Sequence, residues 1–378
     1  MNRIKECRVC YSKNLKSVAD FGNIKISTFV DDPNDDLGTA PLELLECQDC
    51  TLVQLAHTVP PEIMYHTYWY ESSTNKVIAD NLREIVTEIQ KEISIQDNDY
   101  VLDIGANDGT LLESYIWGIR IGCEPAKNII HKLEKRCDHV INDFWNKDYY
   151  KFNKAKVVTA IGMFYDMEDP NQFINDIKEV LRDDGIFVSQ LMTLVPMLEK
   201  YDLGNICHEH LEYYSYKSLV TLFEQNGLEI YKVRMNNIHG GSYQLWARHY
   251  KTGSINLDEP IPDFKKFKDT IDSNKQKCLD FLDLHDNVYI FGASTKGNTI
   301  MQYYGLTPKL VNGAAEVDSK KFGKYAVGSK IPIIPEDEAK KLAEYFSILP
   351  YSFSNYFIDK NKDWNGNWIL CTPKFDIL

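Results

Sequence analysis

The chain lacks any segment of the kind that enters or crosses a membrane. Its 378 residues contain no apolar run long enough to span a bilayer. The first seven residues also lack the apolar core of a signal peptide. We therefore expect a cytoplasmic protein that has no membrane partner.

The chain also lacks an excess of positive charge. It has 42 Lys and Arg against 55 Asp and Glu, which gives a formal net charge of -13. Proteins that bind nucleic acid do so through a basic surface, so nucleic acid is not expected as a partner. Since 44% of the residues are apolar, the chain can bury two or three separate cores.

Cysteine is present in an odd number, nine, without a secretion signal, which favours reduced thiols over disulfides. Four of these residues form two Cys-x-x-Cys pairs, Cys7 with Cys10 and Cys47 with Cys50. Two such pairs are typical of a tetrahedral zinc site, and residues 42–45 and 51–55 suit the short strands of a zinc ribbon. Four sulfur ligands leave no open position on the metal, so we expect structural zinc. Four unpaired cytosolic thiols are the alternative.

A strand and a glycine-bearing turn, Val101 to Leu112, form the stretch around which the chain is organised. The apolar run ends in Gly105 and Gly109, which allow a backbone to approach a ligand closely, and a helix start should follow. The next strand ends in Glu124, where doubly wound folds place a carboxylate that binds ribose hydroxyls. The G-x-G-x-x-G pattern of pyrophosphate cofactors is absent. We expect an adenosine-like ligand here, and a glycine turn of another α/β enzyme is the alternative.

Strands and helices alternate after Glu124, as in a doubly wound sheet. Asp143 and Phe144 follow a short strand and are candidates to contact adenine. Met163 and Tyr165 follow the strand that ends near Ile161. Because ligands of open α/β sheets bind beyond the carboxyl ends of the strands, both residues should border the site.

The stretch from Asn205 to Ser215 has the highest density of titratable groups. Its residues His208, Glu209 and His210 are consecutive, so a strand or loop would point Glu209 away from its neighbours unless the backbone bends. The H-E-x-x-H spacing of zinc enzymes is missing, which disfavours a catalytic metal. The alternative for each histidine is a structural hydrogen bond.

A second α/β unit begins with a strand at residues 287–291 and the turn Gly292 to Gly297, which does not match a Walker loop. Ser294, Lys296 and Asn298, with the backbone N-H groups there, are candidates to hold a diphosphate. A plain tight turn is the alternative.

These motifs together resemble the sugar C-methyltransferase family. The segment Asp103 to Gly109 resembles motif I of class I S-adenosylmethionine (SAM) methyltransferases, although Asn107 stands where many of them have glycine. The resemblance implies an α/β fold with three domains: a zinc-ribbon-like domain (1–60), a SAM-binding Rossmann-like domain (61–252) and a second Rossmann-like domain (253–378) that helps to bind a sugar nucleotide. It implies the following SAM contacts: Asp103, Gly105, Asn107, Asp108, Gly109, Glu124, Asp143, Phe144 and Met163.

Members of that family typically methylate C3 of a nucleotide-linked 4-keto-6-deoxyhexose, and this chemistry requires a base beside the ketone and stabilisation of an enolate. Carried over by motif, His210 is the base, with a pKa suited to neutral pH. Glu209 orients the substrate or its neighbours, and Tyr70 and Tyr165 lie near the sugar. His208 completes the catalytic set.

Two residues depart from the family at the expected reaction centre. Cys207 stands where well-studied members have tyrosine, and Tyr165 stands where many have histidine. An O- or N-methyltransferase of a related sugar therefore remains an alternative, because it needs no carbon acid. A non-catalytic zinc-ribbon module that binds a sugar nucleotide or a partner protein is another. The sequence indicates no particular protein partner.

Overall fold

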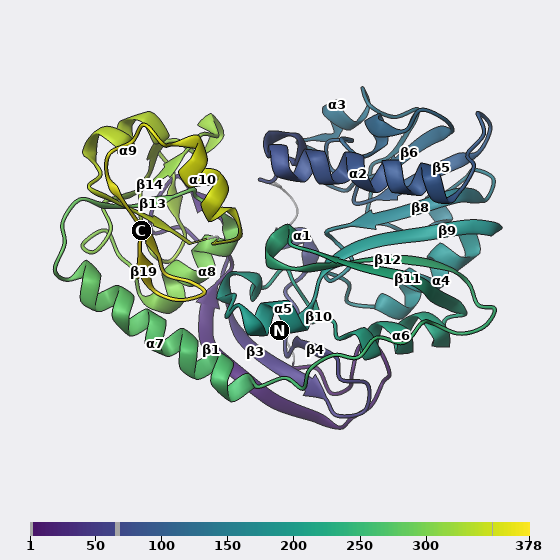
Figure 1. The fold of residues 1–378 in the computed structure, drawn as a ribbon, viewed down its shortest axis with the longest axis horizontal. Coiled ribbons are helices and arrows are strands. Elements are labelled where there is room, and N and C mark those ends of the chain that lie inside the picture. The colour runs from purple at the N-terminus through teal and green to yellow at the C-terminus, as the bar shows by residue number, and fades with distance from the viewer. Residues whose placement is uncertain (1–2, 65–68, 350) are drawn as a thin grey trace.

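Three sheets of different architecture follow one another along the chain. The computed structural model describes residues 3–64, 69–349 and 351–378. Figure 1 shows the N-terminal strands β1, β3 and β4 curving beneath two larger α/β units. We call the parts the N-terminal unit (3–60), the central unit (61–252) and the C-terminal unit (253–378). Of the aromatic segment before the SAM motif, residues 65–68 lie outside the described ranges.

The N-terminal unit is built on an antiparallel sheet with the order β1-β3-β4-β10. Its own strands are β1 (Leu15–Lys25), β3 (Thr39–Cys47) and β4 (Val53–Leu55). Alternate side chains of β3, among them Ala40, Leu42 and Leu44, are buried, which is the pattern of a strand with one face on a core. The edge strand β10 (Glu212–Tyr213) pairs with β4 and belongs by sequence to the central unit. The first sheet therefore includes the chain that follows His210.

The central unit contains a seven-stranded sheet with the order β11-β12-β9-β8-β5-β6-β7. The strands β5 to β9 are parallel, and β12 is antiparallel to both β9 and β11. The bounds are β5 (Tyr100–Ile104), β6 (Ile119–Cys123), β7 (His139–Ile141), β8 (Ala155–Ile161), β9 (Leu181–Met192), β11 (Leu228–Asn236) and β12 (Ser242–His249). This is a doubly wound Rossmann-like sheet, and its fold class confirms the sequence prediction.

The helices of the central unit are α1 (Pro61–Met64), α2 (Lys76–Glu92), α3 (Ile130–Leu133), α4 (Pro170–Val180), α5 (Leu194–Glu199) and α6 (Tyr216–Gln225). The side chain of Asn75 caps α2 by accepting from the N-H groups of Val77 and Ile78. Short 3-10 turns are η1 (Ser72–Thr74), η2 (Leu112–Ser114), η3 (Lys147–Tyr149), η4 (Leu203–Asn205) and η5 (Ile238–Gly240).

The expected helix start after Gly109 is absent, because only the 3-10 turn η2 follows it. No α-helix N-terminus therefore faces the ligand at this turn. Instead, Gly105 and Ala106 donate their backbone N-H groups to the carbonyl of Cys123 on the neighbouring strand. The sequence prediction of a helix N-terminus here was wrong, and a sulfonium ligand without phosphates does not require one.

The C-terminal unit has a six-stranded sheet with the order β16-β14-β13-β17-β18-β19, parallel except for β19. Its strands are β13 (Val288–Phe291), β14 (Gly313–Glu316), β16 (Ile333–Pro335), β17 (Tyr345–Ile348), β18 (Asn367–Leu370) and β19 (Asp376–Ile377). Its helices are α7 (Phe264–Leu282), α8 (Thr295–Tyr304), α9 (Glu336–Leu342) and α10 (Ser354–Lys360), with 3-10 turns η6 (Ser319–Lys321) and η7 (Tyr351–Phe353). A second Rossmann-like unit is thus present.

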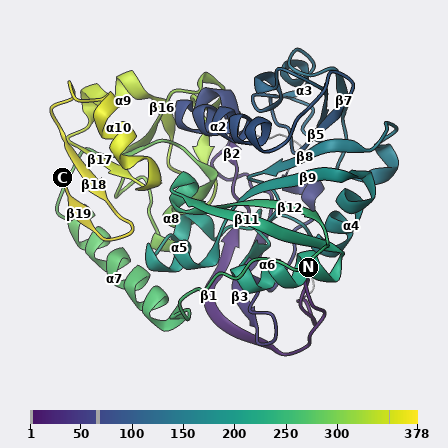
Figure 2. The ribbon, with the colours of Figure 1, turned by 45° about the vertical axis from the view of Figure 1, so that its right-hand side comes forward.

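The three units are joined by shared structure. β15 (Tyr325–Ala326) of the C-terminal unit pairs with β2 (Phe29–Val30) of the N-terminal unit. Figure 2 shows α7 running along the C-terminal unit toward β1, against which it packs. One hydrophobic core contains side chains from all three units, including Leu42, Leu203 and Ile300. Within this arrangement α8 packs on η4, which brings the second Rossmann-like unit to the segment before His210.

Among the described residues, no helix is both long enough and apolar enough to span a bilayer.

Candidate active site

A cavity of about 450 Å³ lies at the carboxyl ends of β5, β6 and β8. This is where an open α/β sheet binds its ligand. Five of the predicted SAM contacts line it: Gly105, Asn107, Glu124, Phe144 and Met163. Tyr70 and Asp166 line it as well, so one of the predicted substrate residues borders the same space.

Glu124 is held rigidly at the cavity wall. Its Oε2 accepts from the backbone N-H of Asn107 at 2.9 Å, and its Oε1 accepts from the N-H of Ala126 at 2.8 Å. Burial raises the pKa of the Glu124 carboxyl, and these two donors oppose that rise. Since each carboxylate oxygen can accept more than one hydrogen bond, the group can still accept from two ribose hydroxyls.

Asn107 occupies a left-handed backbone position, with φ at 51°. Glycine and asparagine are the residues that tolerate this region best, which accounts for asparagine at a position often occupied by glycine. The asparagine side chain adds two contacts that glycine cannot make. Its Oδ1 accepts from the N-H of Ser72 at 2.9 Å, and its Nδ2 donates to the carbonyl of Tyr70 at 3.0 Å. Asn107 thus fixes the segment that carries Tyr70 onto the SAM turn.

Asp103 and Asp108 support the cavity without lining it. The buried Asp103 accepts from Thr159 Oγ1 at 2.6 Å, and burial raises its pKa to about 7. Asp108 accepts from the N-H of Ser73 at 3.0 Å and forms an ion pair with Arg136 at 3.2 Å. Direct contact of either aspartate with the cofactor stays a prediction.

Gly109 and Asp143 likewise stand outside the lining. Gly109 has φ at 82°, and a Cβ there would lie 2.9 Å from Arg136 Cβ, so the position requires glycine for the turn itself. The exposed Asp143 accepts from the backbone N-H of Phe144 at 2.8 Å. It therefore orients the residue that lines the cavity, and its own contact with adenine stays a prediction.

The residues around His210 converge because the backbone turns. The N-H of His210 donates to the carbonyl of Cys207 at 3.2 Å. Ligand atoms of Cys207, Glu209 and His210 consequently lie within 4.8 Å of one another. The backbone bend that brings these side chains together is thus present, and Glu209 does not point away from its neighbours. The charge of Lys296, which acts on all three groups, opposes binding of a metal cation between them.

His210 has one defined tautomer. Its Nδ1 lies 2.7 Å from the carbonyl oxygen of Asn205, and because a carbonyl only accepts, Nδ1 carries the proton. Nε2 is therefore the unprotonated acceptor, as a base requires. Burial and the charge of Lys296 lower the pKa of His210 to about 3. This differs from the expected pKa near neutrality, because the sequence does not show that His210 is buried and lies close to Lys296.

Glu209 has the pKa that was expected for His210. Burial raises the pKa of its carboxyl to about 7, and Lys296 opposes that rise. Part of the residue is exposed, whereas only 7% of the surface of His210 is. Glu209 is therefore both the stronger base of the two in the site without substrate and the more accessible one.

The remaining predicted catalytic residues are distributed around this turn. His208 donates through Nε2 to the carbonyl of Ala40 on β3 at 3.2 Å, so its contact is structural. Tyr165 packs edge-on against His210 with ring centroids 4.7 Å apart and donates its hydroxyl to the carbonyl of Gly162 at 2.7 Å. Tyr70 lines the cavity and is 37% exposed. Tyr165 thus lies between His210 and the wall of the cavity at Gly162.

The three predicted diphosphate residues make separate contacts. The Ser294 hydroxyl accepts from the N-H of Gly297 at 2.9 Å and caps α8. Asn298 is fully buried and donates to the carbonyl of Thr28 at 3.0 Å. Lys296 points to the His210 turn, where Nζ lies 2.6 Å from Asn205 Oδ1. Diphosphate binding at this turn stays a prediction.

His239 and Gln190 are among the residues of the cavity wall that were not predicted. His239 lies in η5 with φ at 52°, lines the cavity and has its pKa lowered by burial and by the charges of Lys296 and His210. Gln190 lines the cavity at the end of β9, and its Oε1 accepts from Asn236 and Gln244, both at 2.8 Å. Gln190 could have been predicted from the sequence, because it lies near the end of a strand. His239 could not, because no periodic pattern marks it.

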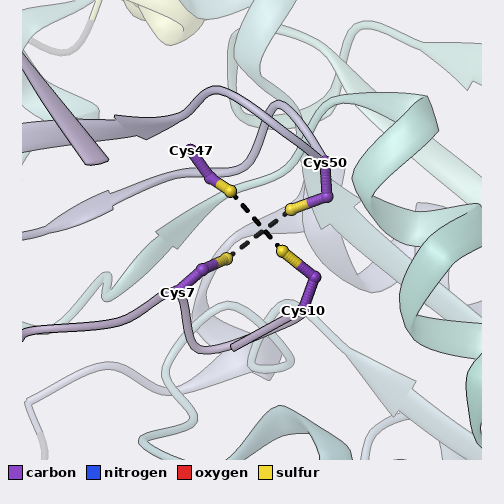
Figure 3. Close-up of side chains that lie close together, drawn as sticks. All are labelled: Cys7, Cys10, Cys47 and Cys50. Carbon is purple, nitrogen blue, oxygen red and sulfur yellow. Dashed lines mark hydrogen bonds between the residues drawn. The ribbon is translucent and has the colours of Figure 1, made fainter. Parts of the chain in front are cut away.

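The four predicted zinc ligands form one cluster. Figure 3 shows the cysteines facing one another, with Cys7 opposite Cys50 and Cys10 opposite Cys47, each sulfur pair 3.5 Å apart. All four sulfurs lie within 4.8 Å of one another. Sulfurs on a tetrahedral zinc ion are about 3.8 Å apart, given Zn–S bonds of about 2.3 Å. The residues therefore fit one zinc ion with four thiolate ligands.

Comparison with known proteins agrees with this architecture. Family models match three consecutive regions: "Putative zinc binding domain" at residues 7–65, "Methyltransferase domain" at 70–233 and "C-methyltransferase C-terminal domain" at 237–373. The chain is a SAM-dependent methyltransferase. The order of the three regions in the methyltransferase supports a C-methyltransferase family, and an enzyme rather than a non-catalytic zinc module.

One curated relative extends over nearly the whole methyltransferase. It is the C-methyltransferase NovU of Streptomyces niveus, 26% identical over 403 residues, covering 98% of this chain and 96% of the relative. Among solved structures, magnesium protoporphyrin IX methyltransferase of Synechocystis PCC 6803 with bound SAH is 12% identical. It covers 47% of this chain and 88% of that one, with a TM-score of 0.38. The CcbJ methyltransferase of Streptomyces caelestis is 13% identical and covers 45% and 90%, with a TM-score of 0.36.

Proposed function

We propose that the enzyme transfers a methyl group to C3 of a nucleotide-linked 4-keto-6-deoxyhexose. The observation that carries this proposal is the His210 turn. It holds an unprotonated imidazole nitrogen and a carboxylate together, and it is linked to the wall of the SAM cavity through Tyr165, which packs on His210 and donates to the carbonyl of Gly162. A carbon next to a ketone becomes nucleophilic only after it loses a proton, so a base at this place serves C-methylation directly. The C-terminal family match and the C-methyltransferase relative support it as well.

In this proposal His210 Nε2 removes the proton from the carbon beside the ketone. The hydrogen bond from Nδ1 to Asn205 keeps the imidazole in the required tautomer. The low pKa of His210 describes the site without substrate. Negative charge that develops on the substrate during proton removal favours the imidazolium and offsets this effect. Glu209, with a pKa of about 7, is the nearest group that can accept the proton in turn.

Glu124 and the turn at Gly105 would hold the cofactor, and SAM supplies the methyl group when it is bound. Tyr70, fixed by Asn107, lines the cavity, and Tyr165 contacts both His210 and Gly162 of the cavity wall. They would orient the sugar ring. The nucleotide would occupy the C-terminal unit, whose parallel sheet ends at the turn around Ser294.

O- or N-methylation of a related sugar is the second candidate. The pKa of about 3 at His210 favours it, because such a weak base is poorly suited to remove a proton from carbon. Cys207 and Tyr165, the two departures at the reaction centre, point in the same direction. Methyl transfer to oxygen or nitrogen does not need an enolate, so it should tolerate changes at His210.

The test is mass spectrometry of a panel of nucleotide-linked 4-keto-6-deoxy sugars in heavy water, with and without SAM. C-methylation predicts deuterium at the ring carbon beside the ketone without SAM, and a methyl group on that carbon with SAM. H210A should then reduce both by about 100- to 10,000-fold. H249Q serves as the control, because His249 also donates to a backbone carbonyl, that of Leu181, at 3.2 Å. Methylation on oxygen or nitrogen without exchange would refute the proposal.

A further inference from the structure

Lys296 belongs to the C-terminal unit, and its side chain reaches the His210 turn of the central unit. It lies in the first turn of α8, and its Nζ contacts two residues of the central unit: Asn205 Oδ1 at 2.6 Å and Met192 Sδ at 3.1 Å. The same Asn205 accepts from His210 through its carbonyl oxygen. One residue therefore holds both the base and the ammonium in fixed relation.

The partners of this ammonium are neutral. Among the described ranges, no carboxylate lies within the 4.0 Å of an ion pair with Lys296 Nζ, although Asp202, Cys207, Glu209 and Asp166 interact with it at longer range. An amide oxygen and a thioether sulfur occupy two of the three hydrogens of the ammonium. One hydrogen of the ammonium is thus left for an incoming anionic oxygen. Burial lowers the pKa of Lys296, and the nearby acidic groups, Asp202 first among them, oppose that effect.

The place of Lys296 at the N-terminus of its helix adds to the positive potential around it. The N-terminus of a helix is the positive end of its dipole, where acidic side chains are favoured and lysine is not. α8 has no acidic residue in its first turn. The dipole and the lysine together create a positive potential at the His210 turn. Burial raises the pKa values of Glu209 and Cys207 and the charge of Lys296 opposes that rise, whereas at His210 burial and Lys296 both lower the pKa.

We propose that Lys296 is a catalytic residue whose ammonium binds the ketone oxygen of the substrate and stabilises the enolate. The proposal rests on the function proposed above. His210 Nε2 takes the proton, and the electron pair of the broken C–H bond forms a carbon–carbon double bond. The π electrons of the carbonyl move to its oxygen, next to Lys296. When the carbon forms its new bond to the methyl group, the carbonyl reforms and the methyl–sulfur bonding pair stays on sulfur.

This role differs from the one suggested by the turn alone. A lysine that clamped a diphosphate would contribute the same binding energy before and during the reaction, so its loss would raise KM. A lysine that meets the enolate oxygen acts mainly in the transition state, so its loss would lower kcat. Lys296 lies at the residue that holds the base, which favours the second role.

The experiment measures enolisation without the methyl donor. Wild type, K296Q and K296R are placed in heavy water with the panel sugar that the wild type exchanges fastest, and deuterium at the carbon beside the ketone is followed by mass spectrometry. K296Q should exchange about 100- to 1,000-fold more slowly, the size expected when one oxyanion donor is lost. K296R keeps the charge, so its exchange rate should be at least about tenfold higher than that of K296Q.

Two further measurements separate catalysis from folding. SAM affinity by calorimetry and the melting temperature should be unchanged in K296Q, and its KM should stay within a few fold of wild type. K275Q is the matched control, because Lys275 donates to the carbonyl of Tyr303 at 2.7 Å, near the other end of α8. It should exchange like wild type.

Three results would overturn the proposal. Exchange by K296Q at the wild-type rate removes the enolate role. Equally slow exchange by K296Q and K296R, together with altered melting temperatures, assigns Lys296 a structural role. A raised KM with unchanged exchange at saturation assigns it to the diphosphate. If the wild type methylates oxygen or nitrogen and never exchanges, the proposed function itself fails, and that outcome is visible without any variant.

Discussion

Replacing Asn107 with glycine tests how the SAM turn positions Tyr70. Glycine adopts the observed φ of 51° without strain, so the turn itself should persist. The substitution removes the hydrogen bond that the Asn107 side chain accepts from Ser72 and the one that it donates to Tyr70. Each is worth about 1 kcal/mol, and losing both lowers the free energy of local opening by about 2 kcal/mol, which is about 30-fold in the opening equilibrium.

Hydrogen exchange of the peptide that covers residues 70–75 measures this opening directly. N107G should raise the exchange rate of the Ser72 amide by about 30-fold and lower kcat, with SAM affinity changed only a few fold. N107A adds the cost of an alanine at positive φ, about 1–2 kcal/mol, so it should also weaken SAM binding.

N175A is the control, because it removes a different side-chain hydrogen bond, to Asn226 at 2.7 Å. It should leave exchange at residues 70–75 unchanged. Wild-type protection of Ser72 in N107G would refute the reasoning. It would mean that the ion pairs of Glu71 with Lys132 and Lys320 hold the segment by themselves.

Three further predictions concern the metal, the cofactor and the buried acid. The protein should bind one zinc ion per chain by atomic absorption, and C10S should lose it together with about 5–10 °C of melting temperature, whereas retention of full stability would contradict a structural ion. E124Q should weaken SAM binding in calorimetry by about 10- to 100-fold, and the exposed E113Q should not. The raised pKa of Asp103 means that the folded state holds a proton that the unfolded state releases, so stability should fall as pH rises from about 4 to about 7. The free energy of unfolding of D103N should therefore exceed that of wild type by up to about 4 kcal/mol at pH 8 and equal it near pH 4. Equal pH profiles of the two proteins in denaturant melts would argue against a protonated Asp103.

The fold was predictable because its signals are local. Apolar runs, glycine turns and two Cys-x-x-Cys pairs each lie within a few residues, and they indicated the Rossmann-like and zinc-binding units that the structure contains. The strand β10 gives no such signal, since it has two residues and acquires its partner, β4, from about 160 positions earlier in the chain.

The candidate site was predictable where topology determines it. Gly105, Glu124 and Met163 follow strands of one parallel sheet, so their meeting at one cavity follows from the fold class. The contact of Lys296 with Asn205 joins residues 91 positions apart on different units, and sequence spacing carries no information about it. The low pKa of His210 depends first on its burial and then on the charge of Lys296, and neither is visible in the sequence.

The strand β10 joins the N-terminal unit to the turn that holds the proposed base, His210. The turn that holds His210 is fixed on one side by His208, which bonds to Ala40, and on the other by β10, which pairs with β4. Both partners belong to the sheet that carries Cys47. A chimera that exchanged residues 1–60 with those of a relative would therefore also need to exchange the segment from Asn205 to Ser215. These two stretches behave as one module, although the whole SAM-binding turn lies between them in the gene.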